Sequence, residues 1–452
     1  MSVPATTAGT AATGSGSRSG QPGNPVVAND PSTVSPRSEG RPAVTVDPPA
    51  SAGEIRAEAL IDTDAIAHNT RTLLERLRSQ RESIDLMAVV KADGYGHGAE
   101  QAALAALRGG AAWLGVATPT EALQLRAAGI TAPLLAWLWP AAENIRPAVS
   151  AGIDLGISSL AHLDAVVAAG ASSPRIHVKI DTGLGRNGVG PAELGGVLDA
   201  VAAAQRAGHV EMIGLMSHLA SADVPGDPSV AEQTATFREA LERADQAGIR
   251  AQFRHLANTP AVIDHPATYF DLARCGIGLY GINPVATVMN LRPAMTLRAT
   301  VALTKRVPAG FGVSYGLTYR TTAETTLALV PLGYADGIPR AASSIGEVWL
   351  GGKRRRIAGR VAMDQFVVDC GDDDVGAGAE VIIFGPGDQG EPTADDWAAF
   401  CETINYEIVT RIGARVPRRY FGRPESAPEL SRSLVDDGRS RWRPTTPGGE
   451  GS

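Results

Sequence analysis

The feature that most constrains the fold is a repeated alternation between short apolar runs and longer Ala- and Leu-rich stretches. The longer stretches, such as AEQAALAALRGG (99–110) and TEALQLRAAGI (120–130), have the apolar spacing of helices and often close on a glycine. The alternation repeats about eight times within about 220 residues, which predicts a closed parallel (β/α)₈ barrel, with an open doubly wound sheet as the structural alternative. The apolar runs lie at 86–91, 112–117, 133–138, 154–159, 175–181, 212–218, 253–258 and 270–281.

The sequence pattern changes near residue 293. From there, strand-like runs divided by Gly, Asp and Pro turns replace the alternation of strand-like and helix-like stretches. We therefore predict the barrel at 55–292 and a mostly β domain at 293–423. An early strand, EALIDTDAI (58–66), could belong to either domain. The ends, 1–54 and 424–452, are rich in Ser, Gly and Pro, and the first lacks Leu, Ile, Phe, Trp and Tyr. Both are predicted to be flexible tails, because they cannot bury enough apolar surface to offset the entropy of ordering.

Charge and cysteine content exclude several classes of protein. A net charge of −7 gives no basic footprint for nucleic acid or for an anionic membrane surface. No apolar run approaches the roughly 20 residues of a membrane span, and the N-terminus lacks a signal-peptide pattern. Cys275, Cys370 and Cys401 are odd in number and widely spaced, which predicts neither a disulfide framework nor a metal site and favours a cytoplasmic location.

Lysine is scarce, because only four of the 41 basic residues are lysines: Lys91, Lys179, Lys305 and Lys353. An amine can lose its proton and attack a carbonyl, whereas a guanidinium effectively cannot. The remaining lysines are therefore candidates for positions where an amine is needed for its chemistry, although a surface lysine kept by chance is the alternative at each one.

Polar residues end several of the predicted barrel strands, where barrels of this kind carry their chemistry. Lys91 ends the first strand, and a Gly-rich loop follows it in KADGYGHG (91–98). Such a lysine could bind a phosphate or form a Schiff base with an aldehyde or carbonyl compound. The Walker pattern is missing, which weakens a nucleotide-binding interpretation. Later strands end near Lys179, His218, His255 with Asn258, and Arg274.

Nine motifs, in order along the chain, resemble those of bacterial alanine racemases, and the resemblance covers about residues 57–423, leaving out only the two tails. The motifs are VVKADGYGHG (89–98), KIDTGLGRNG (179–188), GLMSHLASAD (214–223), HLANTPA (255–261), LARCGIGLYG (272–281), VSYGLTYR (313–320), LGYADGIPR (332–340), GRVAMDQ (359–365) and INYEIVTR (404–411).

The resemblance implies a pyridoxal 5'-phosphate enzyme that interconverts L- and D-alanine and supplies D-alanine for peptidoglycan. It also implies a head-to-tail homodimer of a barrel and a β domain, with active sites shared between subunits and no metal. Lys91 would hold the cofactor and act as the base toward the D-enantiomer. Tyr315, reaching in from the partner subunit, would be the base toward the L-enantiomer. Racemisation needs a base on each face of the reacting carbon, with the cofactor ring as electron sink.

The resemblance also assigns residues to the cofactor and the substrate. Those implied at the cofactor are Arg274 against the ring nitrogen, His218 beside it, Asn258, and Tyr95, Thr259, Gly276 and Ile277 around the phosphate. Those implied at the substrate carboxylate are Arg186 and the backbone N–H of Met363, with Lys179 as a carbamylation site next to Arg186. Those implied in the entry corridor are Tyr334, Asp223 and Arg340. One departure is Ala414, where some family members carry a phosphate-binding tyrosine before RVPR.

Three competing functions differ from an alanine racemase in testable ways. A lysine- or serine-directed, or broader, racemase on the same scaffold would differ only in pocket walls, which the motifs do not define. A non-enzymatic pyridoxal-phosphate carrier would be a lone barrel without Tyr315. A related decarboxylase would need a cysteine where VAMDQ has Met363.

Overall fold

Eight parallel strands form one sheet in the computed structural model, which describes residues 55–170 and 173–423. The sheet order is β8-β7-β6-β5-β4-β3-β2-β9. Backbone hydrogen bonds from Asp271 N–H to Arg254 O and from Arg274 N–H to Ala257 O join its two edges. The predicted (β/α)₈ barrel is therefore confirmed. Its strands are β2 (Asp85–Val89), β3 (Trp113–Val116), β4 (Leu134–Ala136), β5 (Asp154–Ile157), β6 (Arg175–Lys179), β7 (Glu211–Met216), β8 (Phe253–His255) and β9 (Leu272–Cys275).

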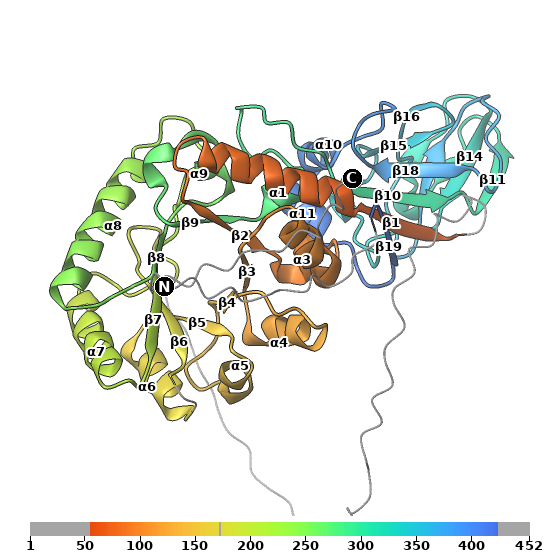
Figure 1. Ribbon diagram of the computed structural model, residues 1–452. Coiled ribbons are helices and arrows are strands. Elements are labelled where there is room, and N and C mark those ends of the chain that lie inside the picture. The colour runs from red at the N-terminus through yellow and green to blue at the C-terminus, as the bar shows by residue number, and fades with distance from the viewer. Residues whose placement is uncertain (1–54, 171–172, 424–452) are drawn as a thin grey trace, which may run out of the picture. The chain divides into compact units, whose positions relative to one another are not determined.

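The longer helices of this part of the chain lie outside these strands and cover the barrel (Figure 1). The helices of this part are α1 (Thr63–Arg78), α2 (Lys91–Tyr95), α3 (Ala99–Arg108), α4 (Pro119–Ala127), α5 (Arg146–Ser150), α6 (Leu160–Ala168), α7 (Leu194–Arg206), α8 (Ser229–Gln246) and α9 (Thr259–Asp264), with 3₁₀ turns at η2 (Pro266–Thr268) and η3 (Ile277–Tyr280). Strands β3, β4, β5 and β9 are buried along their whole length, as expected of parallel strands covered on both faces. One buried cluster that includes Met87, Trp113, Leu135 and Ile213 packs residues of β2, β3, β4 and β7 together.

The later part of the chain is mostly β structure. Its strands are β10 (Met295–Thr300), β11 (Leu303–Val307), β12 (Gly312–Val313), β13 (Tyr319–Arg320), β14 (Thr325–Val330), β15 (Glu347–Leu350), β16 (Lys353–Arg356), β17 (Phe366–Asp369), β18 (Glu380–Phe384) and β19 (Arg418–Phe421). The other elements are η4 (Tyr315–Leu317), η5 (Arg340–Ala342), α10 (Ala394–Phe400) and α11 (Asn405–Thr410). The sheet orders are β16-β15-β18-β10-β1-β19, β11-β14-β17 and β12-β13.

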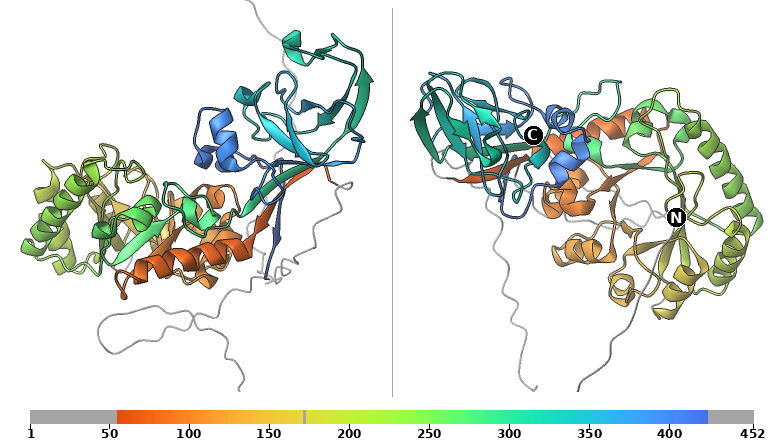
Figure 2. Two further views of the ribbon diagram at one scale, coloured as in Figure 1. Left: turned by 90° about the horizontal axis from the view of Figure 1, so that it is seen from above. Right: turned by 180° about the vertical axis from the view of Figure 1, so that it is seen from behind.

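The early strand that the sequence left unassigned belongs to the later sheet. Strand β1 (Ala57–Asp62) pairs antiparallel with β10 and parallel with β19. Figure 2 shows this red segment of the chain lying among strands of the later part. The limits 55–292 and 293–423 therefore stay a proposal about domain organisation, and the predicted tails at 1–54 and 424–452 lie outside the described residues.

The end of the chain packs against the loop that follows the first barrel strand. The Arg418 guanidinium donates a hydrogen bond to Gly96 O at 3.0 Å. Gly96 has a φ of 81°, and a Cβ at this position would lie 2.4 Å from Val409 O of α11. A side chain is therefore excluded here, and the loop after Lys91 is fixed by elements from both parts of the chain.

Candidate active site

A cavity of about 710 Å³, within the size range of small-molecule sites, opens at the carboxyl ends of the barrel strands. Ten of the fifteen predicted site residues line it. They are Lys91, Tyr95, Lys179, Arg186, His218, Asn258, Thr259, Arg274, Gly276 and Ile277. The barrel therefore brings together side chains that are far apart in the sequence.

Lys91 lies at the start of an unusual turn. Strand β2 ends at Val89, so Lys91 is the first residue of α2. The prediction that Lys91 is the last residue of the strand is therefore wrong. The chain leaves the strand early because Ala92, Asp93, Gly94 and Tyr95 all have left-handed φ values, between 53° and 62°. Such a conformation costs roughly 1 kcal/mol or more for each non-glycine residue and is typical of functional sites.

Glu121, in the first turn of α4 after β3, holds this turn in place. Its carboxylate accepts a hydrogen bond from Ala92 N–H at 2.7 Å and two more from Ala117 and Thr118 N–H at 2.8 and 3.0 Å. It also forms a capping box with Thr118 at the start of α4. One carboxylate thus joins the ends of β2 and β3, which fixes the position of Lys91 at the cavity wall.

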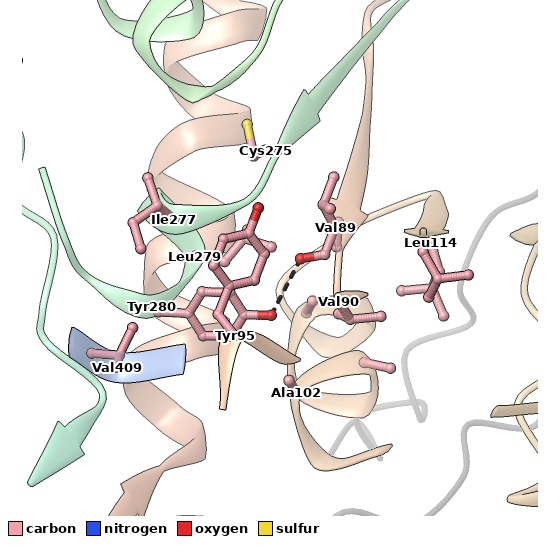
Figure 3. Close-up of a cluster of buried hydrophobic side chains, with 14 of the residues drawn as sticks. Val89, Val90, Tyr95, Ala102, Leu114, Cys275, Ile277, Leu279, Tyr280 and Val409 are labelled. Atoms are coloured by element: carbon pink, nitrogen blue, oxygen red, sulfur yellow. Dashed lines mark hydrogen bonds between the residues drawn. The ribbon is translucent and has the colours of Figure 1, made fainter. Parts of the chain in front are cut away.

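A cluster of aromatic rings supports the same turn (Figure 3). The Tyr95 ring lies 5.0 Å from that of Tyr280 and 6.3 Å from that of Tyr406, between ring centroids. The Tyr280 hydroxyl donates to Val89 O at 3.2 Å. A Cβ on Gly276 would lie 2.3 Å from the Tyr95 hydroxyl oxygen, so only glycine lets this phenol approach the backbone there. The Gly276 N–H donates to Thr259 Oγ1 at 3.0 Å.

Arg274 is buried at the cavity floor with nearly all of its donors in use. Its two terminal nitrogens donate to the carbonyl oxygens of His255, Ser217 and Leu256 at 2.8, 2.5 and 3.0 Å. They also contact His255 Nδ1 at 3.1 Å and His218 Nδ1 at 3.4 Å, the second being a contact that the resemblance implied. Within the described ranges Nε makes no hydrogen bond, so the Nε–H is the one donor of this cavity-lining residue without a partner there.

Positive charge dominates the cavity. Lys91, Lys179, Arg186 and Arg274 line it, whereas no carboxylate does so among the described residues. Burial, aided by Arg186 and opposed by Glu121, lowers the pKa of Lys91. Burial and the nearby Arg274 and Arg186 lower the pKa of Lys179 to about 8. Burial also lowers the pKa of Arg274, to about 10, which leaves it charged at neutral pH. The cavity therefore suits an anionic ligand and contains amines that deprotonate more readily than those of surface lysines.

Lys179 lies on β6 beside Arg186, as the sequence indicated. Its Nζ donates to Asn187 O at 2.7 Å, which holds the amine against the loop that carries Arg186. Asn187 is itself fixed, because its Oδ1 accepts from Ser158 Oγ at 2.8 Å. The carbamylation of Lys179 stays a prediction.

Five predicted residues do not line the cavity. Tyr315, Met363 and Tyr334 are 71%, 53% and 43% exposed, and Arg340 and Asp223 are also exposed. The first three belong to one group of loops: Ser314 Oγ donates to Arg360 O, and Tyr334 N–H donates to Ala362 O. These side chains are thus presented on the surface of the single chain.

Ten of the residues that line the cavity were not predicted, and four of them come from two segments that the site predictions left out entirely. Trp137 and Leu138 follow β4, and Tyr406 and Thr410 lie on α11. The spacing of Tyr406 and Thr410, four residues apart within INYEIVTR, places them on one helix face and was the signal that could have found them. Ala414, the departure from the family pattern, is exposed and does not line the cavity.

Metal-ligand clusters and membrane-spanning helices are both absent from the described ranges, 55–170 and 173–423. No group of three or more His, Cys, Asp and Glu side chains there could hold a metal ion. No helix in these ranges is both long and apolar enough to cross a membrane.

Comparisons with known proteins agree with the fold. Two family models match, the alanine racemase N-terminal domain at residues 61–284 and the alanine racemase C-terminal domain at 294–420. An alanine racemase of Salinispora arenicola is 55% identical over 372 residues, covering 81% of this chain and 99% of the relative. One of Streptomyces coelicolor is 51% identical over 379 residues, covering 81% and 96%.

Solved structures give the same result. The alanine racemase of D-cycloserine-producing Streptomyces lavendulae matches with a TM-score of 0.78 at 51% identity, over 81% of this chain and 97% of the other. The alanine racemase of Bacillus anthracis with bound L-Ala-P matches with a TM-score of 0.76 at 34% identity, over 83% and 96%.

Proposed function

The chain belongs to the alanine racemase family and interconverts L- and D-alanine, and from that premise we propose that it does so with pyridoxal 5'-phosphate held in the cationic cavity. The observation that carries the proposal is a cavity lined by four cationic side chains and no described carboxylate, with a lysine of lowered pKa at its wall. A phosphorylated aldehyde fits both features, because the cations attract its phosphate and an amine can bond to its carbonyl carbon.

The residues that would hold the cofactor fit its parts one by one. Lys91 would anchor the aldehyde carbon, and the Nε–H of Arg274 would face the ring nitrogen. Tyr95, Thr259, Gly276 and Ile277 line the same cavity and would surround the phosphate, with Asn258 and His218 beside them. When bound, the cofactor supplies an electron sink that makes the α-proton of an amino acid removable.

The chain's own residues then supply the two bases. Lys91 would exchange a proton with Cα on one face, serving D-alanine, and Tyr315 of the partner subunit would exchange one on the opposite face, serving L-alanine. Arg186 and the backbone N–H of Met363 would bind the substrate carboxylate, and Tyr334, Asp223 and Arg340 would line the entry. The exposure of Tyr315, 71%, supports a role in a site on a second copy, and hence a homodimer with shared sites.

Reduction with borohydride is expected to fix the cofactor to Lys91. The amine bonded to an aldehyde becomes a stable secondary amine, which peptide mapping locates. Because only four lysines exist, the labelled site is readily distinguished. A pyridoxyl group on Lys91 is the expected result. A label found mainly on Lys305 or Lys353, both exposed in the structure, would contradict the proposed anchor.

Substrate choice is the point on which racemases of different specificity differ. We expect kcat/KM to be highest for alanine and at least about 10-fold lower for serine and for lysine, because added side-chain atoms must fit against the cavity walls. Trp137 and Leu138 are the bulky walls. The comparison is made with enantiopure substrates and chiral product analysis. A higher kcat/KM for lysine would replace the alanine assignment by the lysine-directed one.

A non-enzymatic carrier and a decarboxylase both have less support than a racemase. The second family model, at 294–420, disagrees with a lone-barrel carrier, and the matched relatives are alanine racemases and not decarboxylases. We further propose a cytoplasmic enzyme that supplies D-alanine for peptidoglycan and binds no nucleic acid. The net charge of −7 supports the last point.

A further inference from the structure

A chain of hydrogen bonds runs from Arg274 through the barrel interior, away from the cavity. The Arg274 guanidinium contacts His255 Nδ1 at 3.1 Å, and His255 Nε2 lies 2.9 Å from His177 Nδ1. His177 Nε2 lies 3.2 Å from Asp154 Oδ2. Both histidines are fully buried, and Asp154 is 1% exposed. Neither His177 nor Asp154 lines the cavity. These hydrogen bonds connect them to it through His255 and Arg274.

The direction of every proton in this chain follows from its two ends. A guanidinium only donates, so His255 Nδ1 must accept, and the proton of His255 is on Nε2. His255 then donates to His177 Nδ1, and His177 must carry its own proton on Nε2, which it donates to the Asp154 carboxylate. Both imidazoles are therefore neutral and share the same tautomer. Burial lowers the pKa of His177 and lowers that of His255 well below its ordinary value, which agrees with neutral rings.

Arg175 holds Asp154, the last residue in this series of hydrogen bonds. Its Nε donates to Asp154 Oδ1 at 2.6 Å, and a terminal nitrogen donates to Oδ2 at 3.2 Å. The side chain of Arg175 is 33% exposed, whereas that of Asp154 is 2% exposed. The Trp113 and His177 rings pack in a T-shaped arrangement, with centroids 5.6 Å apart. The carboxylate is thus held in one orientation, with Oδ1 toward Arg175 and Oδ2 shared between Arg175 and His177.

We propose that Asp154 and His177 are positioning residues for the racemase reaction, which set the tautomer of His255 and thereby hold Arg274 with its Nε–H toward the cofactor. The inference rests on the proposed function, because it gives Arg274 a cofactor to face. Without the hydrogen bonds from Asp154 and His177, His255 would be free to carry its proton on Nδ1, where that proton would face the N–H of Arg274. The Arg274 guanidinium would then rotate, and its Nε–H would no longer face the cofactor.

Asparagine at position 154 is expected to reverse the donor and acceptor of each hydrogen bond between residue 154, His177 and His255. Arg175 has only donors, and its shorter bond, from Nε at 2.6 Å, would attract the amide oxygen of Asn to the place of Oδ1 rather than to that of Oδ2, where the Arg175 bond is 3.2 Å long. The amide NH₂ would then face His177 Nε2 and force the proton of His177 onto Nδ1. His255 would follow, with its own proton forced onto Nδ1 against Arg274. Asp154→Asn is therefore predicted to lower kcat for alanine about 10- to 100-fold, with a smaller change in KM.

A double variant separates this effect from the loss of an ion pair. In Asp154→Asn with Arg175→Met nothing holds the amide oxygen, so the Asn side chain can rotate and present it to His177. We expect the double variant to recover kcat about 3- to 30-fold over Asp154→Asn. A purely structural role for the Asp154–Arg175 pair predicts no recovery, and that result would overturn the inference.

Glu211→Gln is the matched control. Glu211 lies 3.6 Å from Arg175, is 44% exposed and makes no contact with His177 among the described residues. The substitution removes a carboxylate from the same group of charges without touching the chain of hydrogen bonds. It is expected to leave kcat at the parental value, and a loss equal to that of Asp154→Asn would show that net charge alone matters.

The tautomers themselves are measured by neutron diffraction from crystals of the perdeuterated, pyridoxal-phosphate-loaded enzyme. We expect deuterons on Nε2 and not on Nδ1 of both His177 and His255 in the parent, and the reverse in Asp154→Asn. If Asp154→Asn does not fold, the parent alone decides, because a deuteron on Nδ1 of either ring overturns the inference. Failure of the proposed function is distinct, since the parent would then neither gain visible absorbance with pyridoxal phosphate nor racemise alanine.

Discussion

Replacing Lys91 by arginine is expected to reduce racemisation of alanine by about 10⁴-fold in both directions. Arginine keeps the positive charge of the cavity wall but cannot bond to an aldehyde or give up its proton near neutral pH. The variant therefore loses both proposed tasks, the covalent anchor and one of the two bases, and general base catalysis alone is worth about 10²–10⁴-fold. The rate is followed by chiral analysis of alanine starting from each enantiomer.

Two controls make the Lys91 result specific. Lys353→Arg changes an exposed lysine whose Nζ pairs with Asp373 at 2.5 Å, and it is expected to keep the parental rate. Methylamine added to Lys91→Arg tests for a missing amine, and a partial return of activity is the expected result. Retention of more than a tenth of the parental rate by Lys91→Arg would exclude Lys91 as both anchor and base.

The barrel could be predicted because its signal is local. Each strand and helix carries its own apolar spacing, and a parallel sheet follows from their alternation. The pairing of β1 could not be predicted in this way, because its partners β10 and β19 lie far later in the chain. An isolated apolar run shows that a strand exists, whereas its neighbours are decided by tertiary packing.

Much of the cavity could be predicted from residues that end strands, because parallel strands of a barrel meet at one mouth. The turn after Lys91 was less accessible, since the left-handed φ values of Ala92 and Asp93 are imposed by Glu121 and the packing around it. The hydrogen-bond chain behind Arg274 does have a signal in the sequence. His177 and Lys179 are two residues apart on β6, so both side chains lie on the same face of the sheet.

Replacing Tyr315 by phenylalanine is expected to lower L- to D-alanine turnover about 10²–10⁴-fold while the visible absorbance of the bound cofactor stays near that of the parent. The change removes only the phenolic oxygen, from a side chain that is 71% exposed in the single chain, so stability should change little. Tyr319→Phe, four residues after Tyr315, is the matched control. It removes a hydroxyl that donates to Asp369 at 2.6 Å. The control is expected to racemise normally, and full turnover by Tyr315→Phe would defeat the two-base scheme.

Mixing the two inactive variants tests whether the active sites are shared between subunits. If Tyr315 serves the site of the partner subunit, a heterodimer of Lys91→Arg and Tyr315→Phe contains one site with both changes and one site with neither. Random reassociation makes half of the dimers heterodimers, so activity should return to about one quarter of the parental value. If Tyr315 instead served Lys91 of its own chain, every site would carry one change, and the mixture would stay as inactive as its components. The recovered activity should also rise with the time allowed for subunit exchange, because it depends on the formation of heterodimers.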